Sequence, residues 1–150
     1  MKILIFHQYF KLPNQAGSSR LYNFVKGLKN KNYHAVIVTG SSCREGIGNE
    51  KVKRKSIVYK FQLEIGLDVI SIQDFYDQKL PFHKRFLSFL FFSLVAFLVS
   101  IRMKDIDLVF ASSTPLSVGI PAIILSKLRK IPYVLKHYIN NLLVFRGESG

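Results

Sequence analysis

The sequence has few of the groups from which redox or metal centres are built. Cys43 is its single cysteine, so no disulfide and no cysteine-based metal cluster can form within the chain, as is usual in a reducing cytoplasm. Its histidines, His7, His34, His83 and His137, show no metal-ligand spacing. We therefore expect no metal site, and no order of residues along the chain assembles a nucleophile triad.

Two common nucleotide-binding motifs are also missing. There is no G-x-G-x-x-G and no G-x-x-x-x-G-K-[ST], which argues against dinucleotide-binding and P-loop proteins. Acidic residues are scarce: nine Asp and Glu oppose 22 Lys and Arg, the formal net charge is +13, and no acid precedes Glu45. A basic chain suits anionic partners such as nucleic acid, acidic lipid or phosphorylated substrates, although a generally basic proteome would look the same. We expect no nucleic-acid partner, because the basic residues are scattered and no RNA-binding or helix-turn-helix pattern appears.

The alternation of apolar runs and helical spacings predicts an α/β fold, with a Rossmann-like, mainly parallel sheet flanked by helices. We expect strands at Lys2–Phe6, Ala35–Thr39, Asp107–Ala111 and Val134–Leu135, a strand pair at Ile57–Ile65 and Leu67–Ile72, and helices at Arg20–Lys31, Lys84–Arg102 and Ser117–Leu128. The first apolar run ends too early for a signal peptide. Residues 41–55 are typical of a mobile loop, residues 74–81 of a polar connector, and residues 136–150 of a divergent, frayed tail.

The segment Phe86–Ile101 is apolar almost throughout, and basic residues stand on both sides of it. Three interpretations remain open: a helix buried in the core, a helix on the sheet that faces a membrane surface, and a transmembrane helix, for which the segment is slightly short. In the second interpretation the membrane-facing residues are Phe86, Phe89 and Phe92, with Lys84 and Arg85 near acidic lipids.

A small polar loop follows the first expected strand. Gly17, Ser18 and Ser19 precede the first expected helix, where backbone N–H groups and the positive end of the helix dipole favour an anion. Glycine also lets the backbone approach a phosphate closely. A turn that only caps the helix would have the same composition.

Longer stretches resemble the N-terminal domain of family 4 glycosyltransferases, particularly the branch that builds bacterial surface polysaccharides such as lipopolysaccharide. Residues Ile3–Arg20, ILIFHQYFKLPNQAGSSR, resemble that family's opening strand and glycine loop. Residues Asp107–Tyr133, DLVFASSTPLSVGIPAIILSKLRKIPY, resemble its strand, Ser-Ser-x-Pro turn, helix and next strand, and Tyr33–Gly40, YHAVIVTG, resembles its second strand. The resemblance covers about residues 1–135, and it implies the N-terminal half of a GT-B fold.

The resemblance implies roles for particular residues. Gly17 and Ser18 would lie beside the donor phosphates, and Ser112, Ser113 and Thr114 would form a turn at the edge of the cleft. The simpler role for that turn is to cap the next helix through Thr114 or Ser117. Where the family continues with an acidic-Arg-Asp-Leu-Trp-Pro-Glu segment, this chain reads KHYINNLLVF, so no catalytic residue is assigned.

The implied function is transfer of a sugar, with retention, from a nucleotide-sugar to a lipid-linked or polysaccharide acceptor. The nucleotide-sugar is a substrate, and no cofactor is implied. No donor-binding domain precedes Gly150, so we expect a truncated enzyme, inactive alone and peripheral at the cytoplasmic face of the membrane. One alternative is an acceptor-binding subunit whose donor domain is a separate chain. The other is a basic membrane-surface protein without enzymatic activity.

Overall fold

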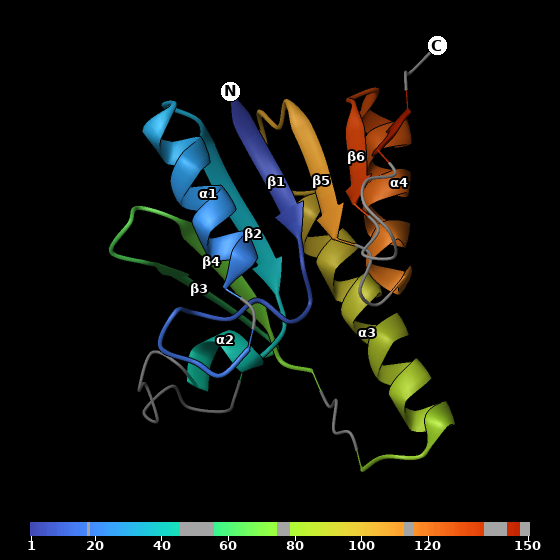
Figure 1. Ribbon diagram of the computed structural model, residues 1–150. Helices are drawn as coiled ribbons and strands as arrows, with labels where there is room; N and C mark the ends of the chain where they lie inside the picture. Colours follow the sequence, from blue (N-terminus) through green and yellow to red (C-terminus); the bar gives the residue numbers. More distant parts are fainter. Residues whose placement is uncertain (18, 46–55, 75–78, 113–115, 137–143, 148–150) are drawn as a thin grey trace.

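The computed structural model describes residues 1–17, 19–45, 56–74, 79–112, 116–136 and 144–147. Strands and helices alternate along most of the chain (Figure 1). The strands are β1 (Lys2–Phe6), β2 (His34–Thr39), β3 (Val58–Gln62), β4 (Asp68–Ile72), β5 (Leu108–Ser112), β6 (Tyr133–Lys136) and β7 (Val144–Gly147). The helices are α1 (Arg20–Asn30), α2 (Ser42–Glu45), α3 (Phe82–Ser100), the 3₁₀ turn η1 (Leu116–Val118) and α4 (Gly119–Arg129).

The strands form one mixed sheet in the order β3-β4-β2-β1-β5-β6-β7. Its five inner strands run parallel, whereas β3 and β7 pair antiparallel with their neighbours. The central strand is β1, in which Phe6 is opposite Val38 of β2 and Ala111 of β5. From β1 the chain adds β2 and β4 on one side of the sheet and later β5 and β6 on the other side. The direction of chain connection therefore reverses between β1 and β5, which is where open α/β sheets bind ligands.

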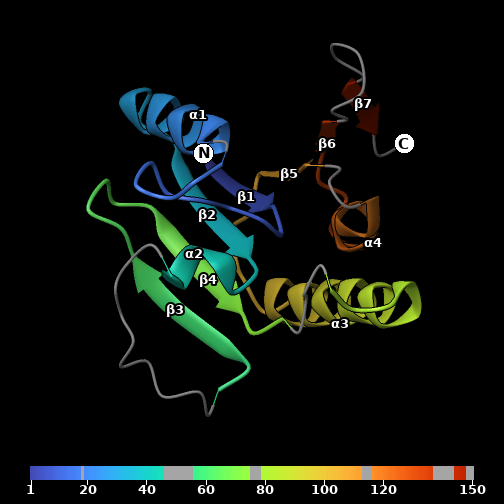
Figure 2. The same ribbon diagram turned by 60° about the horizontal axis from the view of Figure 1, so that its bottom comes forward.

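The sheet is covered on both faces, and each face has its own hydrophobic cluster. α1 lies on one face, and α3 and α4 lie on the other (Figure 2). On the face of α1, Ile3, Ile5 and Ile37 pack with Val25 of the helix. On the opposite face, the cluster combines buried residues of β1, β2, β4 and β5 with residues of α3 and α4, and Tyr133 and Leu135 of β6 pack against it. Burial on both faces explains why β1 and β2 are almost entirely apolar.

The predicted fold class and the main elements are confirmed. β1 has the predicted bounds, α1 and β2 differ from prediction by one residue at one end, and β5 is shifted by one residue at both ends. α3 begins two residues early, after Pro81, and ends two residues early at Ser100. The predicted strand pair around Gly66 is antiparallel β3 and β4.

Three segments differ from the sequence-based expectation. The expected loop 41–55 begins with the short helix α2, whose Cys43 is buried in the cluster beneath α1. The helix expected from Ser117 starts as a 3₁₀ turn and becomes α-helical only at Gly119. Within the tail expected to fray, residues 144–147 form β7, because pairing with β6 satisfies their backbone groups.

Candidate functional site

The candidate site lies at the carboxyl edge of the sheet, where β1, β2, β4 and β5 end. The loop after β1 and the start of α1 lie at this edge, and α3 begins beyond it (Figure 1). We call His7, Gln8, Gly17 and Ser112 the carboxyl-edge site. The parallel register of β1 with β5 pairs Phe6 with Ala111, so the next residues, His7 and Ser112, lie opposite each other. They therefore stand at the reversal of chain connection, on strands about 5 Å apart.

The glycine loop at this edge adopts a backbone conformation that other residues rarely accept. Gly17 has φ +126°, and a Cβ added to it would lie 3.0 Å from Cδ of Lys11. The Lys11 ammonium donates a hydrogen bond to the carbonyl oxygen of Ala16 (2.6 Å). A positive charge therefore lies directly beside the loop. The N-cap residue Ser19 makes no side-chain cap, and the first turn of α1 holds no acid. These features together favour an anion at this position.

Polar atoms without partners lie at the same edge of the sheet. Gln8 is 0% exposed, and neither its amide nitrogen nor its amide oxygen has a hydrogen-bond partner. Ser112 is 2% exposed, and its hydroxyl also lacks a partner, as does Nδ1 of His7. A buried polar atom without a hydrogen bond costs about 1–3 kcal/mol, so a ligand that supplied the missing bonds would be favoured.

His7 and Ser112 lie on the face of the sheet that α1 covers. Ile5 packs in the cluster of that face, and Phe110 stacks on Phe24 of α1 with ring centroids 5.3 Å apart. His7 and Ser112 are each two positions further along their strands, so their side chains continue on the same face. The main-chain N–H of His7 donates to Val38 O (3.0 Å), which extends the β1–β2 ladder to that position.

Burial determines the charge of His7. It lowers the pKa of the imidazole from 6.5 to about 4, so the ring is neutral near pH 7. A neutral imidazole, an amide and a hydroxyl are hydrogen-bonding groups suited to the hydroxyls of a sugar, whereas Lys11 and the start of α1 suit a phosphate. The site can thus hold a ligand that carries both kinds of group.

The rest of the carboxyl edge is held by hydrogen bonds between loops. The hydroxyl of Thr39 donates to Gln8 O (3.2 Å), and Gly40 N donates to the same oxygen (2.9 Å). The amide of Gln15 donates to Ser42 O (2.8 Å) and accepts from Leu12 N (2.9 Å), so it ties the glycine loop to α2. Asp74, which follows β4, accepts hydrogen bonds from the backbone N–H and the hydroxyl of Ser41.

The residues predicted for this site have different outcomes. Gly17 lies at the carboxyl edge with its backbone exposed, and Ser112 ends β5 at the same edge. Ser18, Ser113 and Thr114 fall outside the described residues. Ser117 does not cap the helix, because α4 begins after Val118, with no side-chain cap.

Sequence reasoning missed Lys11 and Gln8. Lys11 is five residues from the oxygen it contacts, and nothing in its sequence neighbourhood signals that the loop turns back on itself. Gln8 follows an apolar run and would ordinarily be exposed, so its burial is seen only in the structure.

The predicted membrane-facing residues of α3 divide into two groups. Phe86 and Lys84 are exposed, while Phe89 and Arg85 are half-buried. Phe92 is wrongly assigned to the membrane face: it is 0% exposed and packs in the cluster between the sheet and α3. The helix has apolar residues on all sides, so sequence periodicity could not separate its inner face from its outer face.

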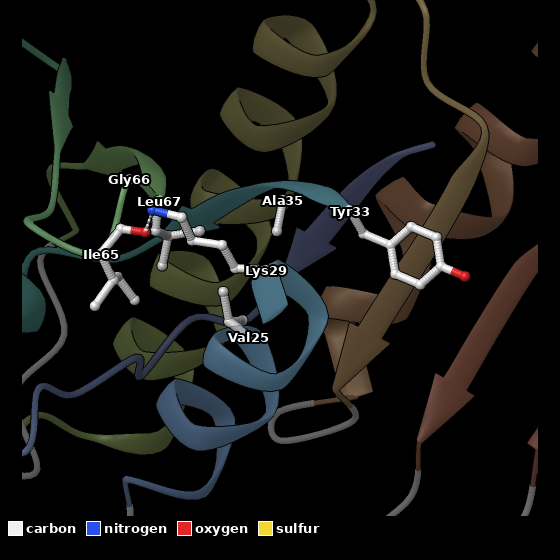
Figure 3. Close-up of a pocket in the computed structure, with 7 residues that line it drawn as sticks. All are labelled: Val25, Lys29, Tyr33, Ala35, Ile65, Gly66 and Leu67. Carbon is white, nitrogen blue, oxygen red and sulfur yellow. Dashed lines mark hydrogen bonds between the residues drawn. The ribbon is translucent and has the colours of Figure 1, made fainter. Parts of the chain in front are cut away.

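A pocket lies at the opposite edge of the sheet, away from these groups. It is lined by Val25, Lys29, Tyr33, Ala35, Ile65, Gly66 and Leu67. Figure 3 shows Lys29 reaching across it to the carbonyl oxygen of Ile65, to which its ammonium donates a hydrogen bond. The lining is mainly apolar, and its one cation already has a partner, so this pocket offers no reactive group. No group of three or more potential metal ligands occurs among the described residues.

Neither family models nor curated proteins match the sequence. Among solved structures, one described as trehalose-6-phosphate from E. coli bound with UDP-2-fluoro glucose is similar, with a TM-score of 0.49 and 8% sequence identity. The similarity covers 91% of this chain and 32% of that chain, so the present chain spans about a third of that structure. A likeness at this level assigns neither a family nor an activity.

Proposed function

We propose that the chain is the acceptor-side half of a GT-B glycosyltransferase. The observation that carries the proposal is the combination of Gly17 and Lys11 at the start of α1 with the unpartnered polar atoms of His7, Gln8 and Ser112. Both parts lie at the reversal of chain connection, the position expected for a ligand in this type of sheet. The family resemblance of residues 1–135 gives the same domain and places its donor phosphates at the same loop.

In this proposal the ligand is a sugar linked to a diphosphate. The diphosphate lies against the backbone of the Gly17 loop and the Lys11 ammonium, and the sugar hydroxyls pair with the buried amide of Gln8 and the hydroxyl of Ser112. The neutral ring of His7 exchanges a hydrogen bond with the ligand through Nδ1. These residues bind and orient the ligand, and the proposal assigns no proton transfer to them.

A second domain completes the enzyme in this proposal, either in the same protein or in a partner chain. The family resemblance places the groups that grip the nucleotide in that domain. Binding energy from the nucleotide is what such enzymes direct to the reacting centre, so we expect the 150 residues alone to bind without transferring a sugar. The acceptor would be a lipid-linked sugar or a polysaccharide at the cytoplasmic face of the membrane.

The test is a binding titration, monitored by NMR or calorimetry, with two kinds of probe: inorganic pyrophosphate and a panel of nucleotide-sugars. We expect Lys11→Gln to weaken binding of both probes, because each carries a diphosphate. We expect Ser112→Ala to weaken only the nucleotide-sugars, because pyrophosphate has no hydroxyl to pair with it. The matched control is Lys26→Gln, which removes an exposed cation from the middle of α1.

The proposal fails if neither probe binds saturably, or if Lys26→Gln weakens pyrophosphate as much as Lys11→Gln does. Transfer of sugar by the purified chain, to water or to a lipid-linked acceptor, would refute the claim that it needs a second domain. The binding titrations are read separately from membrane binding, because they use no lipid.

A further inference from the structure

α3 packs against the sheet with Phe92 and several small residues inward, and it carries large apolar residues on its outer side as well. The fully or nearly buried residues of the helix are Ser88, Phe92, Ser93, Ala96 and Ser100. The exposed ones include Leu87, Leu90, Leu94 and Leu98, which recur every three or four residues and so form one stripe. Leu94 is 58% exposed. A helix on the surface of a soluble protein ordinarily shows the opposite arrangement, with polar residues toward water.

A hydrogen bond from a serine of α3 and the packing of its neighbours fix which face of the helix points toward the sheet. The hydroxyl of Ser93 donates to Ser117 O at the start of the α4 segment (2.8 Å), and the hydroxyl of Ser100 donates to Ala96 O (2.6 Å). Phe92 and Ala96 pack with strand residues in the same cluster. Turning the leucines inward would break the hydrogen bond from Ser93 to Ser117 O and the packing of Phe92 and Ala96, so the outward stripe is a property of the packed helix.

α4 repeats the pattern beside α3 on the same face of the sheet. Its buried residues are Gly119, Pro121, Ala122, Leu125 and Ser126. Its exposed apolar residues are Ile120, Ile124 and Leu128, spaced four apart, of which Leu128 is 61% exposed. The two neighbouring helices therefore present their apolar stripes on the outer side of one layer, and a contiguous exposed apolar patch of this kind marks an interaction site.

Cations stand at both ends of α3 and at the C-terminal end of α4, and acids are missing from the two helices. Neither Phe82–Ser100 nor Leu116–Lys130 contains an Asp or Glu. These basic residues are Lys84, Arg85, Arg102, Lys104, Lys127, Arg129 and Lys130, of which Arg129 also donates hydrogen bonds to the carbonyl oxygens of Ile101 and Met103. Apolar stripes with a basic rim are the complement of a bilayer whose surface carries anionic head groups.

We propose that the outer sides of α3 and α4 together form a docking face for an anionic lipid bilayer. The face is defined by Leu87, Leu90, Leu94, Leu98, Ile120, Ile124 and Leu128, with the basic residues at its rim. The leucines and isoleucines enter the boundary between head groups and acyl chains, and the cations pair with the head groups. The first turns of α3 extend past the ends of β1, β2 and β5, so docking holds the carboxyl edge next to the lipid surface (Figure 1).

The chain lies on the membrane and does not cross it. α3 is long and apolar enough to span a bilayer by length and composition, with 22% of its apolar window buried. However, Phe92, Ala96 and Ser100 are fully buried against the sheet and α4, and inserting the helix would strip them from that core. If α3 left the sheet to span a bilayer, the sheet face that it covers would also be exposed to water.

The test is flotation of the chain with vesicles of phosphatidylcholine, with or without phosphatidylglycerol. We expect binding to vesicles that contain phosphatidylglycerol, and release as the salt concentration rises from about 0.01 M to about 1 M, where the Debye length falls from about 30 Å to about 3 Å. Leu94→Gln combined with Ile124→Gln should weaken binding at least about tenfold, because both side chains lose their apolar contact with lipid. Lys84→Gln combined with Lys127→Gln should weaken it by about fivefold per residue.

Two control variants separate docking from general effects. Ile57→Gln removes an exposed apolar residue before β3, and Lys26→Gln combined with Lys31→Gln removes two cations at α1, on the other face of the sheet. Both should bind vesicles as the unmodified chain does. Circular dichroism checks that every variant is folded, and Leu98→Gln alone serves if the paired variant is not.

Four outcomes would overturn the proposal. The first is equal binding to vesicles with and without phosphatidylglycerol, and the second is equal loss in the control variants. The third is resistance of the bound chain to carbonate, which would make α3 a membrane span. If instead the chain bound no vesicles and formed a dimer that Leu94→Gln dissociates, the face would belong to a second copy. Pyrophosphate titration of the same variants keeps this test separate from that of the carboxyl-edge site.

Discussion

Replacing Gly17 by alanine tests the geometry of the glycine loop directly. Gly17 has φ +126°, a region that is nearly closed to residues with a side chain. A residue held there costs about 1–3 kcal/mol. The added Cβ would also lie 3.0 Å from Cδ of Lys11, which must move and so loosens the hydrogen bond from its ammonium to Ala16 O.

The net loss is smaller than the strain, because alanine also restricts the unfolded chain. That restriction is worth about 0.4–1 kcal/mol in favour of the variant. We therefore expect Gly17→Ala to lower the free energy of unfolding by about 1–2 kcal/mol, which for a chain of this length lowers Tm by roughly 2–8 °C. Urea denaturation followed by circular dichroism gives the free energy, and a thermal scan gives Tm.

Gly27→Ala is the matched control. Gly27 lies within α1, is exposed, and has no atom within 4 Å of an added Cβ. Alanine there should raise the free energy of unfolding by about 0.5–1 kcal/mol, because it favours the helix over the unfolded chain. The two substitutions should thus have opposite signs. If Gly17→Ala stabilised the chain as Gly27→Ala does, the loop would not have the conformation described and its proposed role as an anion cradle would lose its basis.

Three further substitutions or measurements test the packing and the buried groups. Phe92→Ala should cost about 3–5 kcal/mol because Phe92 is fully buried, whereas Phe86→Ala, at an exposed position of the same helix, should cost under about 1 kcal/mol; equal costs in urea denaturation would contradict the described orientation of α3. The pKa of His7 is lowered to about 4, so the unfolded chain binds the proton more tightly than the folded chain. The free energy of unfolding should therefore fall as the pH falls from about 6.5 to about 4, by on the order of 3 kcal/mol more than in His7→Gln. Identical pH profiles of the two proteins would show that His7 is not buried. Burial raises the pKa of the Cys43 thiol to about 11, against a smaller opposite effect of Arg44, so labelling by a disulfide reagent at pH 8 should be slower by about a hundredfold or more in the folded chain than in urea; rapid labelling of the native chain would mean that α2 opens readily.

Much of the fold follows from short-range sequence patterns. β1 and β2 are predictable because parallel strands buried on both faces are continuous apolar runs, bounded here by polar residues. α1 is predictable because its apolar residues have helical spacing. β7 is not, because its four residues have no strong pattern and depend on pairing with β6.

The orientation of α3 could not be predicted, because phenylalanine and leucine surround it and hydrophobic periodicity names no face. The structure shows that the serines mark the inner face, contrary to the usual rule for surface helices. At the carboxyl edge, the position of Gly17 follows from the β-loop-α pattern. The neighbourhood of His7 and Ser112 does not, since they are more than a hundred residues apart and only the register of β1 with β5 brings them together.

The central place of β1 has a consequence during synthesis on the ribosome. The first strand to emerge pairs with β2 as soon as about forty residues are available, but its other edge stays open until β5 arrives. About 70 residues separate the end of β2 from the start of β5. At about 5–20 residues per second, they take roughly 4–14 s to be made.

Throughout that interval the nascent chain presents an unpaired, almost entirely apolar strand edge, the kind of surface on which chains aggregate. α3 is synthesised in the same interval, and its serine-lined inner face has as yet no β5 to pack against. If its outer face meets a membrane early, lipid would shelter the leucines while the centre of the sheet is still incomplete. The order of the strands thus makes the time and place of translation a condition for the yield of folded protein.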